Sequence, residues 1–316
     1  MPKLTVIITT FKRPVFLAQA IKSVLKQTWQ DFKICVYDNH SEDETKQVVE
    51  EFQREDDRIE YFCQPKNIGG EENGKVAMSR VTTPFYCTLF DDDVMLSGYL
   101  KIAMDGFQRY PEAIFSSCST QLIDEHGNLG AVTMRSWRSG LYQPSEGMIP
   151  MLSGDFPAIV STVFRLEARP IFERVVVGVG CPSDYALMLA LSAKWPYVFS
   201  RTPGICYRVH VGSSSYRPSS DYLYPGFMMI AKNLESMNLL SQRRLSIVRR
   251  KLQQKYHAGM ILFLFYALTS WDIKEAFKII WIAAHPHVTL SQMISDYVLI
   301  KLRDIARHWL PKMVRP

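Results

Sequence analysis

Closely spaced pairs of cysteines are missing from this chain. Its 316 residues include six cysteines but no Cys-x-x-Cys motif, and most of the six stand in apolar, strand-like runs where cysteine behaves as a small hydrophobic residue. This pattern excludes a disulfide framework and a cysteine-based zinc site. We also expect no N-terminal signal peptide, because residues 2–3 lead directly into an expected strand. We therefore expect a reducing, cytoplasmic setting.

Long apolar runs, glycine-rich phosphate loops and nucleic-acid-binding motifs are missing as well. Residues 258–271 are apolar, but they fall short of the roughly 20 residues that a membrane-spanning helix needs. Residues 9–13 follow the first expected strand and contain no glycine, so a glycine-rich phosphate loop does not stand there. No recognised motif accompanies the basic residues, and nucleic acid is therefore not an expected partner.

Positive charge is concentrated in the last quarter of the chain. The net charge is +6, and residues 241–316 contain 13 Lys or Arg against 4 Asp or Glu, which leaves the first 240 residues slightly acidic. Basic residues interleaved with Trp, Phe and Leu are typical of helices that lie in a membrane interface. We therefore expect contact with an anionic membrane surface, peripherally at the inner face of the cell membrane. The alternative is a helical subdomain that packs on protein and leaves its basic residues in solvent.

The first 95 residues alternate between strand-like and helix-like patterns. Apolar, β-branched runs predict strands over residues 4–9, 31–37, 59–63 and 85–90. Apolar residues at helical spacing predict helices from Pro14 and over residues 44–52. This alternation predicts βαβ units and a parallel sheet.

Three local expectations concern the region that follows. Ser97 is expected to cap a helix that runs to about Arg109. Residues 123–129 are expected to form a hairpin turn, because Gly127 and Asn128 can supply left-handed positions. Residues 156–165 are expected to form a strand.

Carboxylates follow two of these strands at the point where each strand ends. Asp38 follows the second strand, the triplet 91–93 follows the strand at 85–90, and Thr9 closes the first strand. The carboxyl ends of parallel strands share one edge, where nucleotides bind. Hard divalent metals are held there by one or two carboxylates together with substrate phosphates. The alternatives are a solvated acidic turn for the triplet and a turn-forming or capping role for Asp38.

Ordered blocks along the chain resemble those of family 2 glycosyltransferases. The blocks are residues 6–14, 21–28 and 36–43, then Asn67-Ile68-Gly69-Gly70, then the acidic triplet. The similarity covers about residues 3–215. It implies an α/β GT-A nucleotide-diphospho-sugar transferase fold, which has a Rossmann-like mixed sheet flanked by helices, followed by a C-terminal helical extension. The implied domains are a catalytic domain at 1–220, with a nucleotide-binding half at 1–95 and an acceptor-binding half at 96–220, and the extension at 221–316.

The resemblance also assigns donor-binding roles to individual residues. Thr9 and Phe11 resemble positions that line the nucleotide base, and Asp38 resembles the carboxylate that accepts a hydrogen bond from a base N–H. Asn73 and Lys75 fall near the wall of the donor pocket.

Metal and sugar roles fall on the acidic triplet of the DXD motif. Asp91 resembles the acid that contacts the ribose or the sugar, and Asp92 resembles the ligand of Mn²⁺ or Mg²⁺, with Asp93 as a substitute ligand. Phe90 stands where the motif usually has its first Asp.

Two later segments complete the resemblance. The Tyr-Arg-x-His pattern at 207–210 resembles a loop that folds over the donor, where Arg208 or His210 would touch the diphosphate or its metal. The alternative for His210 is an ordinary structural histidine. Asp184 stands where the family places its catalytic base, and the alternative is an acid at a helix N-terminus, favoured by the helix dipole.

These assignments imply a metal-dependent inverting glycosyltransferase of the hexosyltransferase type. The expected donor is a nucleotide sugar, with UDP-sugars favoured, and the expected acceptor is a saccharide or a lipid-linked saccharide of a bacterial surface polysaccharide. A general base such as Asp184 would accept the proton of the attacking hydroxyl. Two alternatives are a sugar nucleotidyltransferase and a non-catalytic nucleotide-binding module.

Overall fold

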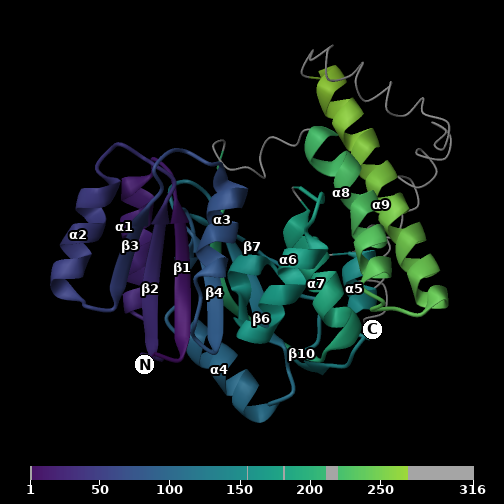
Figure 1. Cartoon of the computed structure of the whole chain (residues 1–316), viewed down its shortest axis with the longest axis horizontal. Helices are drawn as coiled ribbons and strands as arrows, with labels where there is room; N and C mark the ends of the chain where they lie inside the picture. The colour runs from purple at the N-terminus through teal and green to yellow at the C-terminus, as the bar shows by residue number, and fades with distance from the viewer. Residues whose placement is uncertain (1, 155, 181, 211–219, 270–316) are drawn as a thin grey trace, which may run out of the picture. The chain divides into compact units, whose positions relative to one another are not determined.

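The computed structural model of the chain describes residues 2–154, 156–180, 182–210 and 220–269 (Figure 1). The expectations for the tail at 270–316 lie outside these residues. The chain forms two compact units: Met1–Glu173 with Met188–Ser213, and Arg174–Leu187 with Ser214–Pro316. The domain boundary expected at residue 220 stays a prediction.

The first unit is built on a mixed sheet with the strand order β3-β2-β1-β4-β9-β6-β10-β5. Its strands are β1 (Leu4–Thr10), β2 (Phe32–Asp38), β3 (Ile59–Cys63), β4 (Phe85–Phe90), β5 (Val94–Met95), β6 (Phe115–Ile123), β9 (Thr162–Arg165) and β10 (Tyr197–Arg208). Two short strands, β7 (Leu129–Val132) and β8 (Gly140–Tyr142), pair with β6 and β10. The first four strands of the order are parallel, whereas β9 runs antiparallel to both of its neighbours. The mixed α/β sheet expected from the sequence is confirmed.

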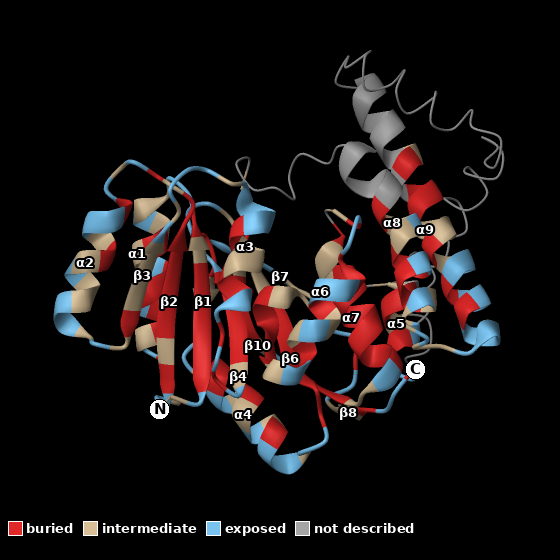
Figure 2. Ribbon diagram, in the orientation of Figure 1, coloured by how far each residue is buried: buried red, intermediate tan, exposed pale blue. Residues whose placement is uncertain are grey.

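Helices cover this sheet and their apolar faces form the core with it. They are α1 (Pro14–Leu25), α2 (Thr45–Glu55), α3 (Gly70–Ser79), α4 (Tyr99–Arg109), α5 (Met148–Ser153) and the first part of α6 (Arg169–Val175), with the 3₁₀ turns η1 (Ile159–Ser161) and η2 (Leu166–Ala168). In α1, Leu17, Ile21 and Val24 are fully buried in the core. In Figure 2 the strands β1 and β2 are coloured as buried along most of their length. Burial of each such side chain stabilises the fold by about 1.5–3 kcal/mol.

The sheet register brings the carboxyl ends of β1, β2 and β4 together. Thr10 is the partner of Asp38 across β1 and β2, and Thr9 is the partner of Phe90 across β1 and β4. The residues after Phe90 therefore leave the sheet beside Thr10 and Asp38. The expectation that the acids following two separate strands share one sheet edge is confirmed.

Two local expectations are wrong in detail. The strand expected over residues 156–165 is shortened to β9, because the hydroxyls of Ser161 and Thr162 donate to the carbonyl of Ala158 and close a 3₁₀ turn instead. Helix α4 does not use Ser97 as its N-cap; Gly98 occupies that position without a side-chain cap. The turn expected around residues 123–129 is present as the β6–β7 hairpin.

The second unit contains the helices α8 (Ser220–Ser236) and α9 (Gln242–Thr269), together with the first residues of α7 (Ser183–Lys194). Leu245, Val248 and Leu252 form the buried stripe of α9, whereas the arginines at 243, 244, 249 and 250 are exposed. This spacing is that of an amphipathic helix. Within the described residues, no helix carries an apolar stretch of the length that crossing a bilayer requires.

Candidate active site

The acidic triplet forms a tight, buried turn at the end of β4. The amide of Asp93 donates to the carbonyl of Phe90 at 3.1 Å, and β5 begins directly afterwards. Asp91, Asp92 and Asp93 are 4%, 8% and 1% exposed. A solvated acidic turn is therefore excluded, and three neighbouring carboxylates are held where their mutual repulsion needs cations or protons to offset it.

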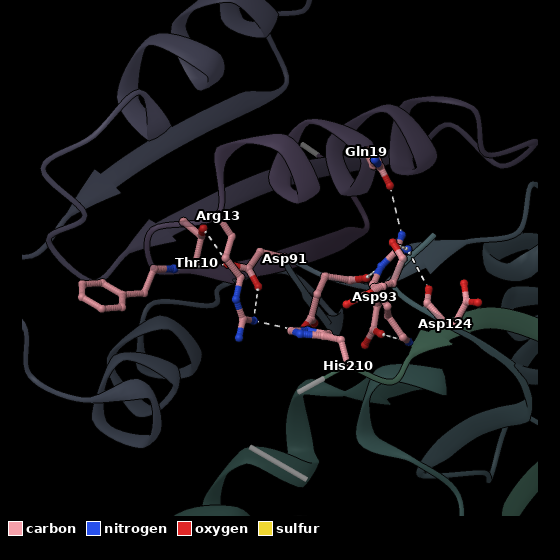
Figure 3. A network of polar contacts seen from close by, with 11 residues as sticks. Thr10, Arg13, Gln19, Asp91, Asp93, Asp124 and His210 are labelled. Atoms are coloured by element: carbon pink, nitrogen blue, oxygen red, sulfur yellow. Dashed lines mark hydrogen bonds and ion pairs between the residues drawn. The ribbon is translucent and has the colours of Figure 1, made fainter. Parts of the chain in front are cut away.

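Asp91 ties the acidic turn to the end of β1. Its Oδ2 accepts hydrogen bonds from the Thr10 hydroxyl at 2.8 Å and the Phe11 amide at 3.2 Å, and its Oδ1 lies 3.1 Å from Nη1 of Arg13 (Figure 3). Burial raises the pKa of Asp91, and the Arg13 guanidinium opposes that shift. The turn and the first strand thus share one polar network.

Two side-chain nitrogens lie within hydrogen-bond distance of the Asp92 carboxylate. Its Oδ2 lies 2.8 Å from Nη1 of Arg13 and 3.0 Å from Nε2 of His210. His210 is reached by the chain just after β10, and its ring lies 5.8 Å from the ring of Phe16 on α1. The sequence-predicted metal residues Asp92 and His210 therefore lie side by side.

Asp93 faces inward. Its Oδ1 accepts the Arg208 amide at 2.8 Å, while its Oδ2 is buried with no hydrogen-bond partner among the described residues. Burial, followed by repulsion from Asp92, raises the pKa of Asp93 well above its usual range.

Arg208 is a buried side chain that joins three segments. Its guanidinium donates to the carbonyls of Asp92, Asp124 and Glu125 and to Oε1 of Gln19, at 2.8–3.2 Å, and it lies 4.6 Å over the ring of Phe16. The acidic turn, the β6–β7 hairpin and α1 are thereby connected through one residue. The predicted donor-binding role of Arg208 stays a prediction, because these contacts are all to protein.

Asp38 lies at the same sheet edge, at the end of β2. Its Oδ1 accepts hydrogen bonds from the amide and hydroxyl of Ser41 at 3.0 and 2.6 Å, and its Oδ2 accepts one from the Tyr61 hydroxyl at 2.6 Å. Burial, reinforced by the bond to Asp38, raises the pKa of Tyr61. The carboxylate is 2% exposed, so the structure gives it a part in holding the loop after β2. The adjacent positions Thr9 and Phe11 are partly exposed and exposed, respectively.

Asn73 and Lys75, on α3, have contacts of other kinds. The amide of Asn73 is buried, donates to the carbonyl of Tyr37 at 2.9 Å and accepts from Gln64 at 3.0 Å. Lys75 forms ion pairs with Glu71 and Glu72 on its own helix. Neither is among the residues that contact the acidic turn, and their donor-binding roles stay predictions.

Asp184, the predicted general base, belongs to the second unit. It lies in the first turn of α7, and its Oδ1 accepts the Tyr185 amide at 2.7 Å. Burial by the surrounding protein raises the pKa of Asp184 to about 6. A carboxylate with this pKa is ionised at neutral pH and is basic enough to accept a proton.

Sequence reasoning missed Arg13, Thr10 and Gln19 as members of this network. A signal was present for Arg13, because the pair Lys12-Arg13 follows the first strand directly, at the edge where the acids were expected. Neither Lys12 nor Arg13 was given a role of its own, because the segment was interpreted through Thr9, Phe11 and its lack of glycine. For Gln19, an exposed residue of a surface helix, no signal in the sequence indicated the contact with Arg208.

The donor set of this site suits a divalent cation that is completed by a substrate. No group of three or more His, Cys, Asp or Glu side chains within the described ranges is arranged to hold a metal by itself. Asp92 and His210 nevertheless lie within 3.0 Å of each other. Carboxylate oxygens suit Mg²⁺ and Mn²⁺, and neutral imidazole is a common metal ligand. One or two protein ligands are sufficient where substrate phosphates and water supply the rest.

Comparison with known proteins gives consistent matches. Residues 5–158 match the family model described as glycosyl transferase family 2. GalNAc(5)-diNAcBac-PP-undecaprenol beta-1,3-glucosyltransferase of Campylobacter jejuni is 41% identical over 130 residues, which is 41% of each chain. Chondroitin synthase of Escherichia coli is 23% identical over 209 residues, covering 66% of this chain and 29% of that protein. The chain thus spans less than half the length of these curated relatives.

Solved structures share the fold at low sequence identity. S. aureus TarS 1-349 in complex with UDP superposes with a TM-score of 0.64 at 14% identity, covering 81% of this chain and 72% of that one. The mannosyltransferase PcManGT of Pyrobaculum calidifontis, in complex with GDP-Man and Mn²⁺, gives a TM-score of 0.55 at 13% identity, covering 98% and 83%. These likenesses confirm the GT-A fold expected from the sequence.

Proposed function

Residues 5–158 are a glycosyl transferase family 2 domain, and from this premise we propose that the chain is an inverting transferase acting on a nucleoside-diphosphate sugar. The observation that carries the proposal is the buried acidic turn at the carboxyl edge of the sheet, beside the ends of β1 and β2. Nucleotides bind at this edge of open α/β sheets. The acceptor is a hydroxyl of a saccharide.

For the donor, we propose a UDP-sugar. The solved relatives of like fold include TarS with UDP and with UDP-GlcNAc, and PcManGT with GDP-Man. In this chain Thr9, Phe11 and Asp38 stand at the ends of β1 and β2, where the base would lie. The exposed ring of Phe11 offers a stacking surface to the base.

We propose that Asp92 and His210 hold a divalent cation, Mn²⁺ or Mg²⁺, together with the donor diphosphate. When bound, this cation would neutralise the charge that develops on the leaving diphosphate. Asp93 stabilises the turn by accepting the hydrogen bond from the Arg208 amide. Asp91 connects the turn to the end of β1 by accepting hydrogen bonds from Thr10 and Phe11. Asp92 would thus be offered to the cation, beside His210, from a turn whose backbone is already stabilised by the hydrogen bonds of Asp91 and Asp93.

We assign the general base to Asp184. In an inverting transfer, the acceptor hydroxyl attacks the anomeric carbon from the face opposite the leaving diphosphate, and its proton passes to a carboxylate as the bond forms. Proton transfer of this kind contributes about 10²–10⁴-fold to the rate. The pKa of about 6 leaves Asp184 ionised at neutral pH.

For the acceptor, we propose a lipid-linked saccharide of a bacterial surface polysaccharide. The support is the C. jejuni relative, whose name places its sugar on a PP-undecaprenol carrier. The exposed arginines of α9 would attract the anionic surface in which such a lipid lies. The chain would then act as a peripheral protein at the inner face of the membrane.

A panel of nucleotide sugars tests the function directly. Each donor is incubated with the chain, with Mn²⁺ or Mg²⁺, and with undecaprenyl-diphosphate saccharides, and release of nucleoside diphosphate is measured. We expect turnover with a UDP-sugar, and loss of turnover in Asp92→Asn but not in Asp105→Asn, an exposed control on α4. Release of pyrophosphate from a sugar phosphate and UTP would instead indicate a nucleotidyltransferase, and nucleotide binding without turnover would indicate a binding module.

A further inference from the structure

Arg13 bridges two carboxylates of the acidic turn with one nitrogen. Its Nη1 lies 3.1 Å from Oδ1 of Asp91 and 2.8 Å from Oδ2 of Asp92. Figure 3 shows the guanidinium extending from the end of β1 toward Asp91 and His210. A positive charge therefore already lies where a metal bound to Asp92 would place its own.

Among the described residues, Arg13 and Arg208 both contact the turn, but in different ways. Arg208 is 4% exposed, and its guanidinium donates to backbone carbonyls and to the amide oxygen of Gln19. The side chain of Arg13 is 31% exposed, and its guanidinium lies against carboxylates. Arg208 is thus fixed in the framework, whereas Arg13 is placed to exchange one anionic partner for another.

Arg13 and His210 share one oxygen of Asp92. Oδ2 of Asp92 is within hydrogen-bond distance of both Arg13 Nη1 and His210 Nε2. A histidine ring offers a lone pair to a metal in its neutral form, but a guanidinium has no acceptor and does not lose its proton in proteins. A cation that binds Asp92 through this oxygen can keep His210 as a neighbour, whereas Arg13 has to withdraw.

We propose that Arg13 is the resident counter-cation of the acidic turn and moves to the donor diphosphate when a divalent metal takes its place. The inference rests on the proposed function, which supplies the diphosphate and the metal. Arg13 is anchored beside both, because its carbonyl accepts the Leu17 amide and so opens α1 at the end of β1. Guanidinium groups bind phosphate oxygens in a bidentate geometry, so the partner that Arg13 loses is replaced by another anion.

A thermodynamic consequence follows from this exchange. Metal alone has to displace Arg13 without offering it a new partner, whereas metal and nucleotide together provide one. Each should therefore strengthen binding of the other, and such coupling is reciprocal between two ligands. Removing the guanidinium should make binding of the metal alone tighter and should reduce the coupling.

Titration calorimetry with Mn²⁺, in the absence and presence of saturating UDP, tests the inference without any turnover. The variants are Arg13→Gln, which removes the charge; Arg13→Lys, which keeps it; and Lys22→Gln, which removes one positive charge from an exposed position of the same helix. We expect Arg13→Gln to bind Mn²⁺ alone about tenfold more tightly than the unaltered chain and to lose most of the stabilisation by UDP. Arg13→Lys and Lys22→Gln should stay close to the unaltered chain, and thermal unfolding curves confirm that each variant is folded.

The possible failures are distinguishable. If UDP strengthens Mn²⁺ binding equally in the unaltered chain and in Arg13→Gln, the role of Arg13 is wrong while the proposed function stands. Weaker binding of Mn²⁺ alone in Arg13→Gln also overturns the exchange, since it would make Arg13 a support of the metal site. If no form of the chain binds Mn²⁺ or UDP, the proposed donor chemistry fails and this inference fails with it.

Discussion

At the scale of the residue, Arg208 shows that a side chain expected to bind the donor also connects the segments of the site. The segment 207–210 lies beside the acids, since the Arg208 amide donates to Asp93 and His210 contacts Asp92. The Tyr-Arg-x-His pattern did not show which groups the Arg208 guanidinium would contact, because these groups are distant in sequence. Asp124 and Glu125 contribute backbone carbonyls, and Gln19 contributes its side-chain oxygen. Every residue has a backbone carbonyl, so residue type does not show which carbonyls will accept a hydrogen bond.

Replacing Arg208 by Met should therefore destabilise the first unit. The change keeps an apolar stem over Phe16 but leaves the carbonyls of Asp92, Asp124 and Glu125 without this donor. A buried polar group that loses its partner costs about 1–3 kcal/mol. The bond to the Asp92 carbonyl is the fully buried one, so we expect the free energy of unfolding to fall by about 1–3 kcal/mol. Denaturant unfolding measures it, with Arg201→Met, at an exposed position of β10, as the control. A loss no larger than that of the control would contradict the assigned structural role.

Asp184 makes a prediction about pH. Because its carboxylate must be ionised to accept the hydroxyl proton, and its pKa is about 6, kcat/KM should fall about tenfold per pH unit below that value and level off above it. The profile is measured from about pH 5 to about pH 8. Asp184→Asn should lower turnover by about 10²–10⁴-fold and remove this acidic limb while leaving UDP affinity unchanged. An unaltered profile would remove Asp184 from the mechanism.

At the scale of the element, the sequence predicted the first half of the chain better than the second. The strands of the first half are apolar runs closed by turns, and β1, β2, β3 and β4 were predicted within about a residue of their observed bounds. The region 156–165 was not, because its hydroxyl groups bond to Ala158 and replace part of a strand by a turn. Hydroxyl side chains compete in this way with the hydrogen bonds of a strand only where a carbonyl lies within reach. The spacing of apolar residues in the sequence does not show where that happens.

Close packing between β10 and its neighbours depends on Gly204. A Cβ added there would lie 2.5 Å from Sγ of Cys118 and 2.5 Å from Cδ2 of the buried Tyr99 ring. Gly204→Ala should therefore lower the free energy of unfolding by about 1–3 kcal/mol. Gly74→Ala, at a helical position with nothing within 4 Å, should instead raise it by about 0.5–1 kcal/mol. Thermal or denaturant unfolding of the pair checks the opposite signs, and equal effects would contradict the packing argument.

The basic face of α9 makes a prediction about membranes. Each Lys or Arg near an anionic surface contributes about 1 kcal/mol, so changing Arg243, Arg244 and Arg250 to Gln should reduce binding to anionic vesicles by at least about tenfold. Flotation with phosphatidylglycerol vesicles, against phosphatidylcholine vesicles, measures this. The matched control changes three exposed lysines of the first unit to Gln: Lys22, Lys46 and Lys101. Equal recovery of both variants with anionic vesicles would favour the alternative of a helical subdomain that packs on protein.

At the scale of the whole molecule, the family, the fold and the shared sheet edge could be predicted from the sequence because each depends on local blocks in a fixed order. The register that sets Thr10 beside Asp38 follows from parallel pairing of two apolar strands. The cations that balance the acids could not be predicted in the same way. Arg13 and Arg208 are 195 positions apart in the chain. The different roles that we propose for them depend on how deeply each side chain is buried, which the sequence does not show.

The stereochemistry of the first product tests the central claim most directly. Proton NMR of a reaction between the accepted UDP-sugar, Mn²⁺ and a lipid-linked saccharide reports the configuration at the anomeric carbon of the transferred sugar. The account predicts an inverted configuration relative to the donor, formed by the unaltered chain and not by Asp92→Asn or Asp184→Asn. A product that retains the donor configuration, or an inverted product formed at an unchanged rate by either variant, would contradict it.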